Sequence, residues 1–277
     1  MKKLSFILFL FLLIPFLAHA AGPVKILIVP GHDDEAWGTQ FKNVKEADMN
    51  VKLGLMLYNK LKKDKNFEVY ITRDWEDYRP EFKEYFSKNG EAIADFIKEK
   101  KTVFNGKMAD GEIDRNQLVE HNTVNNDVAT KLYGLNKWAD ENNIDAMIHI
   151  HFNDYPRGRA WERGDYKGFA IYTPEHQMNN FKESFQLASF VFQKLFHDYA
   201  ISNYPPEKSG VVPDQELIAI GAFDTLHTRS ILIEYGYIYE RKFSTFSKRA
   251  TQMRVMAEDT YQGIKKYFDY IAKQPIK

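Results

Sequence analysis

Residues 25–34 read Lys-Ile-Leu-Ile-Val-Pro-Gly-His-Asp-Asp, an apolar run that ends abruptly at Pro30-Gly31 and is followed by His32. The run has little polar alternation, which is typical of a parallel strand covered on both faces. After a polar loop, residues 43–63 carry apolar side chains at helical spacing, and Glu46 lies near the start of that segment. The stretch 25–46 therefore predicts a strand, a turn and a helix, with one ionisable side chain at each junction.

The same alternation of elements continues along the chain. Apolar, β-branched runs predict strands over residues 67–72, 145–152, 168–172 and 230–234. Helical periodicity predicts helices over residues 122–142, 179–199 and 246–272. We therefore predict an α/β fold, with a mostly parallel, twisted sheet of about six strands and helices on both faces. Residues 75–120 are heavily charged and contain several turn signals and short helical patches, so we expect an insertion over the sheet edge.

The first twenty residues have the composition of a targeting segment. Lys2-Lys3 precede an apolar run over residues 4–17, and Ala18-His19-Ala20 forms a small-x-small cleavage site. The alternative is a membrane anchor, but the apolar run is shorter than the roughly 20 residues that a span requires. We predict a signal peptide over residues 1–20, export to the periplasm or the extracellular space, no membrane contact after cleavage, and a single catalytic domain over residues 21–277.

The overall composition excludes some classes of partner. Lysine plus arginine and aspartate plus glutamate are balanced at 38 each, so there is no basic footprint for nucleic acid. Cysteine is absent, so an exported form must fold without disulfides and rely on its core or on a metal.

Four ionisable residues fall at predicted strand ends or at a helix start: His32, Glu46, His151 and Glu234. The carboxyl ends of parallel strands meet at one edge of a sheet, where ligands bind. Two histidines and one carboxylate with an open position form a catalytic zinc set, here His32, Glu46 and His151. Glu234 is then available to move a proton.

Each of these residues also has a structural interpretation. Glu46 stands three positions after Asn43 and could be the N3 member of a capping box. His32 could be a turn residue. His149 shares a strand face with His151, so either could be the ligand, and we favour His151 because it is nearer the strand end. Glu234 is hardest to explain structurally, because a buried carboxylate is costly unless it is paired or bound to a metal.

At these residues the chain resembles the zinc-dependent N-acetylmuramoyl-L-alanine amidases of the Amidase_3 type. Residues 29–32 resemble the family's Asp-Pro-Gly-His turn, residues 45–50 its Glu-bearing helix start, residues 68–73 its strand ending in Thr-Arg, residues 149–153 its Ser-Ile-His-Ala-Asn strand, and residues 233–238 its Val-Glu-x-Gly-Phe closing strand. The resemblance implies His32, Glu46 and His151 as ligands of one zinc ion, Glu234 as the catalytic residue, and hydrolysis of the amide between N-acetylmuramic acid and L-alanine in peptidoglycan.

The chain departs from the family pattern at several positions. Asp33-Asp34 replace glycines, His149 replaces serine, and Tyr239 stands where Ser-Asn is usual. The family also tends to have an arginine in the helix before the strand that carries the second histidine, and this chain has no clear match for it near residues 131–136. These departures bear on substrate preference more than on metal binding.

Rival functions remain open from the sequence. A zinc carboxypeptidase or another exported amidohydrolase would use the same ligands, and a non-catalytic wall-binding protein would keep only the fold. Two accessory roles are also predicted: the arginine-bearing loop 157–163 could contact stem-peptide carboxylates, and segment 75–120 could gate the site. A solvated loop and a plain surface excursion are the alternatives, and an activator protein is an open question.

Overall fold

The computed structural model describes residues 22–116 and 125–274. Its main sheet has six strands in the order β4-β1-β5-β8-β6-β7. Their bounds are β1 Val24–Pro30, β4 Phe67–Ile71, β5 Ala146–Asn153, β6 Ala170–Pro174, β7 Val211–Asp214 and β8 Arg229–Tyr237. The first four strands of that order are parallel, whereas β6 runs antiparallel to β8 and parallel to β7. The predicted α/β fold with a mostly parallel sheet is confirmed, and β7 is the strand that the sequence did not reveal.

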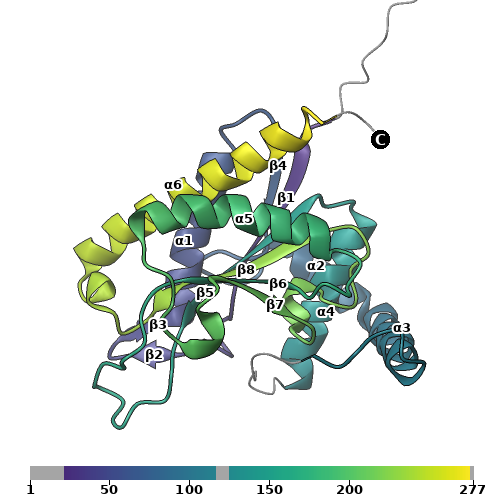
Figure 1. Cartoon of the computed structure of the whole chain (residues 1–277), viewed down its shortest axis with the longest axis horizontal. Coiled ribbons are helices and arrows are strands. Elements are labelled where there is room, and N and C mark those ends of the chain that lie inside the picture. The colour runs from purple at the N-terminus through teal and green to yellow at the C-terminus, as the bar shows by residue number, and fades with distance from the viewer. Residues whose placement is uncertain (1–21, 117–124, 275–277) are drawn as a thin grey trace, which may run out of the picture.

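Helices cover both faces of this sheet (Figure 1). Helices α1 (Glu46–Leu61), α5 (Phe181–Asp198) and α6 (Phe246–Ile271) pack on one face, and α2 (Pro80–Lys88) and α4 (Asn126–Glu141) pack on the other. Helix α3 (Gly90–Ala109) contacts α4 and lies at the periphery. The described residues also contain three short 3-10 turns: η1 Pro205–Glu207, η2 Ile218–Ile220 and η3 Arg241–Phe243.

Strand β1 shows why the strands lack polar alternation. Ile26 and Ile28 contribute to the core under α1, while Leu27 and Val29 contribute to the core under α4. Successive side chains of a strand point to opposite faces, so a strand covered on both faces needs apolar residues throughout. The continuous run at residues 26–29 is therefore a consequence of two-sided burial.

The helix after β1 begins later than the sequence suggested. Residues Gln40–Phe41 (β2) and Val44–Lys45 (β3) form a small hairpin, so α1 starts at Glu46 and not at residue 43. Lys45 is its N-cap, with no side-chain cap, and the capping box that Asn43 would have formed with Glu46 is therefore absent. The backbone amide of Glu46 donates instead to the carbonyl of Thr39 (2.9 Å). The capping interpretation of Glu46 was wrong, because the hairpin already occupies the residues that a box requires.

The charged segment 75–120 folds largely as α2 and α3, with residues 117–120 outside the described part of the chain. Phe82 of α2 is fully buried beside Leu27 and Trp138. This portion therefore contributes to the core, which differs from the expectation of a purely peripheral insertion. A role in gating stays a prediction.

None of the helices in the described ranges combines the length and the apolar composition needed to cross a bilayer.

Candidate active site

Glu46 is the centre of a polar cluster at the carboxyl edge of the sheet. As the first residue of α1 it is 4% exposed, and each of its carboxylate oxygens has a histidine partner. Oε1 lies 3.1 Å from Nδ1 of His151 and accepts from the backbone amide of Phe152 (3.2 Å), while Oε2 lies 3.2 Å from Nε2 of His32. Burial opposes ionisation, but the charges and hydrogen bonds of the two histidines outweigh it and lower the pKa of Glu46 well below its usual range.

His32 is held by the loop in which it lies. Its backbone adopts a left-handed conformation (φ 62°), which is uncommon for a residue other than glycine and costs backbone strain. The buried guanidinium of Arg73 donates to its carbonyl oxygen, and ring atom Nδ1 donates to the carbonyl of Ala36 (3.1 Å). Nε2 is thereby directed at Glu46. A histidine that gives one ring N–H to a backbone carbonyl is in the usual arrangement of a metal ligand.

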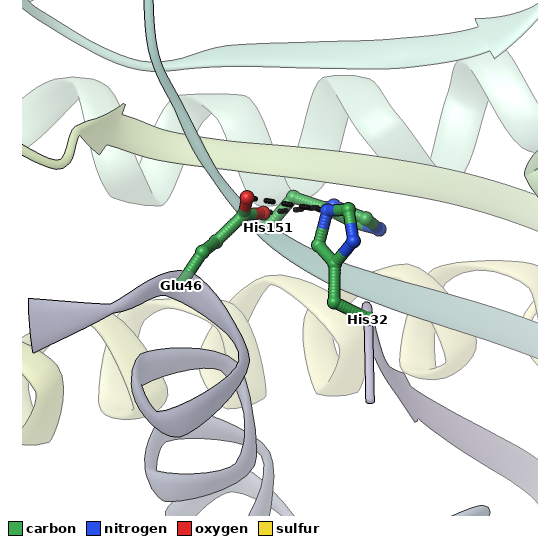
Figure 2. A group of neighbouring side chains, drawn as sticks. All are labelled: His32, Glu46 and His151. Carbon is green, nitrogen blue, oxygen red and sulfur yellow. Dashed lines mark hydrogen bonds and ion pairs between the residues drawn. The ribbon is translucent and has the colours of Figure 1, made fainter. Parts of the chain in front are cut away.

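The three predicted ligands come together from three elements, as Figure 2 shows for His32 after β1, Glu46 at the start of α1 and His151 on β5. One candidate ligand atom from each lies within 4.8 Å of the other two. Two imidazole nitrogens and one carboxylate oxygen are the donor set of catalytic zinc sites with an open position. The donor chemistry therefore fits zinc.

Two glycines leave the space that this cluster needs. A Cβ atom on Gly31 would lie 2.2 Å from Nε2 of His151, and one on Gly38 would lie 2.4 Å from Oε2 of Glu46. Gly38 also has a positive φ of 72°. Side chains at these positions would displace the ligand rings or the carboxylate, so the local sequence is adapted to the cluster.

Asp33, which replaces a family glycine, shapes the loop between His32 and Glu46. Its carboxylate accepts from the backbone amides of Glu35 (3.1 Å) and Ala36 (2.7 Å) and pairs with Lys131 on α4 (3.0 Å). Burial opposes ionisation, but these amides and Lys131 together hold the pKa of Asp33 below its usual value. The substitution thus exchanges backbone freedom for a side chain that fixes the loop.

Glu234 lies beside His151, its register partner across β5 and β8. It is half-buried, and among the described residues its Oε2 atom has no hydrogen-bond partner. Burial and the negative charges of Glu46 and Glu207 raise the pKa of Glu234 well above its usual range. A carboxylate so placed is a stronger proton acceptor than an exposed one.

A cavity of about 470 Å³ joins these groups. His32, His151 and Glu234 line it together with side chains of α4 and the η2 turn. His149 also lines it, so the structure places both histidines of the strand at the cavity, but the Glu46 contact is made by His151. Burial, with a smaller contribution from His151, lowers the pKa of His149 to about 3, so its ring is neutral.

A second buried carboxylate, Glu207, was not predicted from the sequence. Glu207 is 1% exposed, and it accepts hydrogen bonds from four side chains. The donors are Asn153 Nδ2 (2.8 Å), Tyr172 Oη (2.7 Å), Tyr237 Oη (3.0 Å) and Ser202 Oγ. The only local signal is Pro205-Pro206, which marks a turn and says nothing of the partners.

The arginine-bearing loop is anchored to the fold. Arg157 pairs with Asp154 (2.8 Å) and donates to the carbonyl of Ala160 (2.8 Å), and Arg163 donates to the carbonyl of Tyr239 (2.9 Å). Arg159 is the arginine of this loop that remains largely exposed. Contact of the loop with substrate therefore stays a prediction that rests on Arg159.

Comparisons with solved structures show the same fold in cell-wall amidases. An N-acetylmuramoyl-L-alanine amidase from Clostridium difficile 630 is 19% identical, with a TM-score of 0.55, and the match covers 90% of this chain and 98% of that one. AmiC2 of Nostoc punctiforme is 17% identical, with a TM-score of 0.55 and coverage of 90% and 99%. The CwlD amidase from Clostridioides difficile, solved in complex with the GerS lipoprotein, is 17% identical, with a TM-score of 0.57 and coverage of 89% and 99%.

Sequence comparison identifies the family directly. The curated proteins contain no match to the chain. The model of the N-acetylmuramoyl-L-alanine amidase family matches residues 26–266, which include most of β1, the other five strands of the main sheet and most of α6. The chain therefore belongs to this family of enzymes, which hydrolyse the amide bond between N-acetylmuramic acid and L-alanine in peptidoglycan.

Proposed function

We propose that this amidase is zinc-dependent, with His32, Glu46 and His151 as the metal ligands and Glu234 as the group that transfers protons. The observation that carries the proposal is the Glu46 carboxylate, which lies between Nε2 of His32 and Nδ1 of His151 at 3.2 and 3.1 Å. When bound, zinc supplies a Lewis acid that polarises a carbonyl and allows water to attack near neutral pH.

The residues around the metal position have distinct tasks in this proposal. Glu234 takes a proton from the attacking water and delivers it to the leaving nitrogen of L-alanine. Arg73 and Ala36 keep His32 oriented through its carbonyl and its Nδ1 atom. The buried amide of Phe152 fixes Oε1 of Glu46, so little motion is needed when substrate binds.

The decisive experiment separates metal binding from proton transfer. Glu234→Gln should retain one zinc per chain but lose roughly 10²- to 10⁴-fold in the rate of sacculus digestion, as expected when a general acid-base group is removed. Chelation of the wild type should abolish activity, and added zinc should restore it. Full activity of Glu234→Gln would remove this residue from the mechanism.

Product analysis distinguishes this amidase from a zinc carboxypeptidase on the same sheet. Mass analysis of digested sacculi should find intact stem peptides that begin with L-alanine. Release of single terminal residues would support the carboxypeptidase instead, and zinc-independent binding without turnover would support a wall-binding protein.

We further propose that the protein is exported, with cleavage after Ala20 and residues 21–277 as one catalytic domain. The basic start, the apolar run and the small-x-small site support this proposal. Mass analysis of the protein outside the cytoplasm should find a mature chain that begins at Ala21. A chain that keeps its first twenty residues would contradict the cleavage.

A protein activator is a further part of the proposal. The CwlD amidase, which shares the fold, was solved with a lipoprotein partner. If this chain also needs a protein activator, its activity on sacculi should rise when extract from its own cells is added to the purified, zinc-loaded chain. Full activity of the isolated, zinc-loaded chain would argue against such a requirement.

A further inference from the structure

The cavity extends below the metal ligands into the sheet. Val29, His149 and Leu232 are register partners on β1, β5 and β8, and they lie two residues before Gly31, His151 and Glu234. All six residues line the cavity. Apolar side chains of α4 and η2 also line the cavity: Leu132, Leu135 and Ile218. Tyr172 on β6, the register partner of Leu232, also lines the cavity, and its hydroxyl donates to Glu207 (2.7 Å). The deeper part is therefore mostly apolar, and His149 is its buried imidazole.

His149 has no hydrogen-bond partner for either ring nitrogen within the described ranges 22–116 and 125–274. Its side chain is 1% exposed and lines the cavity. A buried polar group without a partner is unfavourable, and nearly all such groups in proteins are satisfied by protein, water or ligand. In the family motif that residues 149–153 resemble, a serine stands at this position, and its side chain is too short to reach equally far. The imidazole is therefore a feature of this chain that its fold does not explain.

The charges around the cavity disfavour an anionic ligand. Five acidic side chains line it: Asp33, Asp154, Glu207, Glu216 and Glu234. Lys131 is the only lysine or arginine among the described lining residues, and it is already paired with Asp33 (3.0 Å) and Glu35 (3.6 Å). With five acidic side chains and one lysine in the lining, a neutral hydrogen-bonding group suits the cavity better than a free carboxylate does.

We propose that His149 hydrogen-bonds an amide group of the stem peptide in this pocket, and that the enzyme prefers stem peptides with amidated carboxylates. The inference rests on the proposed function, because it assigns the pocket to the substrate of that reaction. The peptide fits the pocket better than the glycan does, because the glycan strand continues in both directions from the muramoyl unit and requires an open surface. The volume of about 470 Å³ is within the usual range of about 300 to 1,000 Å³ for ligand pockets.

The first test replaces His149 by an apolar ring. His149→Phe should keep its zinc and melt at the same or a higher temperature, because the ring loses no hydrogen bond within the protein. Its KM for muramyl-L-alanyl-D-isoglutamine should rise about 5-fold, as expected for one neutral hydrogen bond, with kcat nearly unchanged. His176→Phe, at a largely exposed histidine outside the cavity, is the matched control and should leave both parameters unchanged.

The second test compares substrates. The wild type should have a kcat/KM about tenfold higher for muramyl-L-alanyl-D-isoglutamine than for muramyl-L-alanyl-D-glutamate, and His149→Phe should lose most of this preference. His149→Asn keeps a donor and an acceptor, so it should retain more of the preference than His149→Phe does. A purely structural role predicts the reverse order of damage, because asparagine would bury further unsatisfied atoms. Equal rates on both substrates would overturn the proposal.

Binding of the product provides a readout without turnover. L-alanyl-D-isoglutamine should bind the zinc-loaded wild type several-fold more tightly than the His149→Phe variant, measured by calorimetry. If the wild type were inactive but bound the dipeptide more tightly than His149→Phe does, the proposed reaction would be wrong and the role of His149 would stand. An active wild type whose KM, preference and dipeptide affinity are unchanged in His149→Phe would overturn the role of His149 alone.

Discussion

Two buried carboxylates, Glu46 and Glu207, both lie close enough to Glu234 for their charges to act on it, and they have contrasting partners. Glu46 faces two imidazole nitrogens that can act as Lewis bases, whereas Glu207 accepts hydrogen bonds from two tyrosines, a serine and an asparagine. Both side chains are nearly inaccessible to solvent. The first cluster has a donor set that fits a metal ion, while the second is already satisfied by neutral donors.

This difference teaches that burial of a charge does not by itself indicate a functional site. The four donors around Glu207 satisfy its oxygens and tie β5, β6 and β8 to the turn that carries it. Glu46 also accepts from backbone amides, but its two imidazole partners can bind a metal ion, which the hydroxyl and amide donors around Glu207 do not favour. Substitutions in the first cluster should therefore affect zinc binding most strongly, and those in the second should affect stability most strongly.

The largest effect is expected for Glu46→Ala, which removes the carboxylate shared by both histidines. Activity on sacculi should fall by about 10³-fold or more, and the zinc content should drop well below one per chain. Elemental analysis with a digestion assay checks this. If Glu46→Ala retained stoichiometric zinc, the assignment of this ligand would be wrong.

Acid should weaken metal binding at the first cluster. Burial disfavours the His32 imidazolium, but the Glu46 carboxylate outweighs burial and raises the pKa of His32 above its ordinary value of 6.5. Zinc must then displace a proton from His32 once the pH falls below that pKa, and its affinity should drop by about tenfold per pH unit in that range. Zinc titrations at several pH values measure this, and a flat profile would contradict the histidine ligation.

Gly31→Ala tests the first cluster without removing any of its proposed ligands. Its new Cβ atom would fall 2.2 Å from the His151 ring, so the ring must move, and zinc affinity should fall about 10- to 100-fold, as for other substitutions that disturb ligand orientation. Gly106→Ala in α3 is the matched control, because apart from its chain neighbours and the backbone of its own helix no atom lies within 4 Å of the added methyl. That control should bind zinc normally.

Glu207→Ala should destabilise the protein with little loss of zinc. The four donors would lose their common acceptor deep in the fold, and the free energy of unfolding should fall by about 3 kcal/mol. Urea unfolding measures the change. Glu207→Gln keeps one acceptor oxygen and should cost less; loss of zinc without loss of stability would contradict the structural role.

The smallest effect is expected for Ser202→Ala, which removes one of the four donors to Glu207. The cost should be about 1 kcal/mol in the free energy of unfolding, with unchanged activity. A marked loss of activity here would indicate that the second cluster also takes part in the reaction.

The sequence by itself determined the order of the elements and the residue types at the strand ends. Continuous apolar runs such as residues 26–29 predict two-sided strands, because burial on both faces excludes polar residues. The abrupt ends at His32, His151 and Glu234 placed the chemistry at one edge, because parallel strands share their carboxyl ends. Local periodicity can be read from one sequence, and the shared carboxyl edge follows for any set of parallel strands.

Only the tertiary structure decided which groups meet. The hairpin that moves the start of α1 to Glu46, and the anchoring of Arg157 inside its loop, depend on contacts that local periodicity does not encode. Glu207 lies 54 positions from its partner Asn153, and nothing in the spacing of either residue indicates that contact. The same holds for His149, whose strand position was evident but whose missing partners became visible only with the cavity around it. Periodicity reports the face of an element, whereas hydrogen bonding depends on neighbours that are distant in sequence.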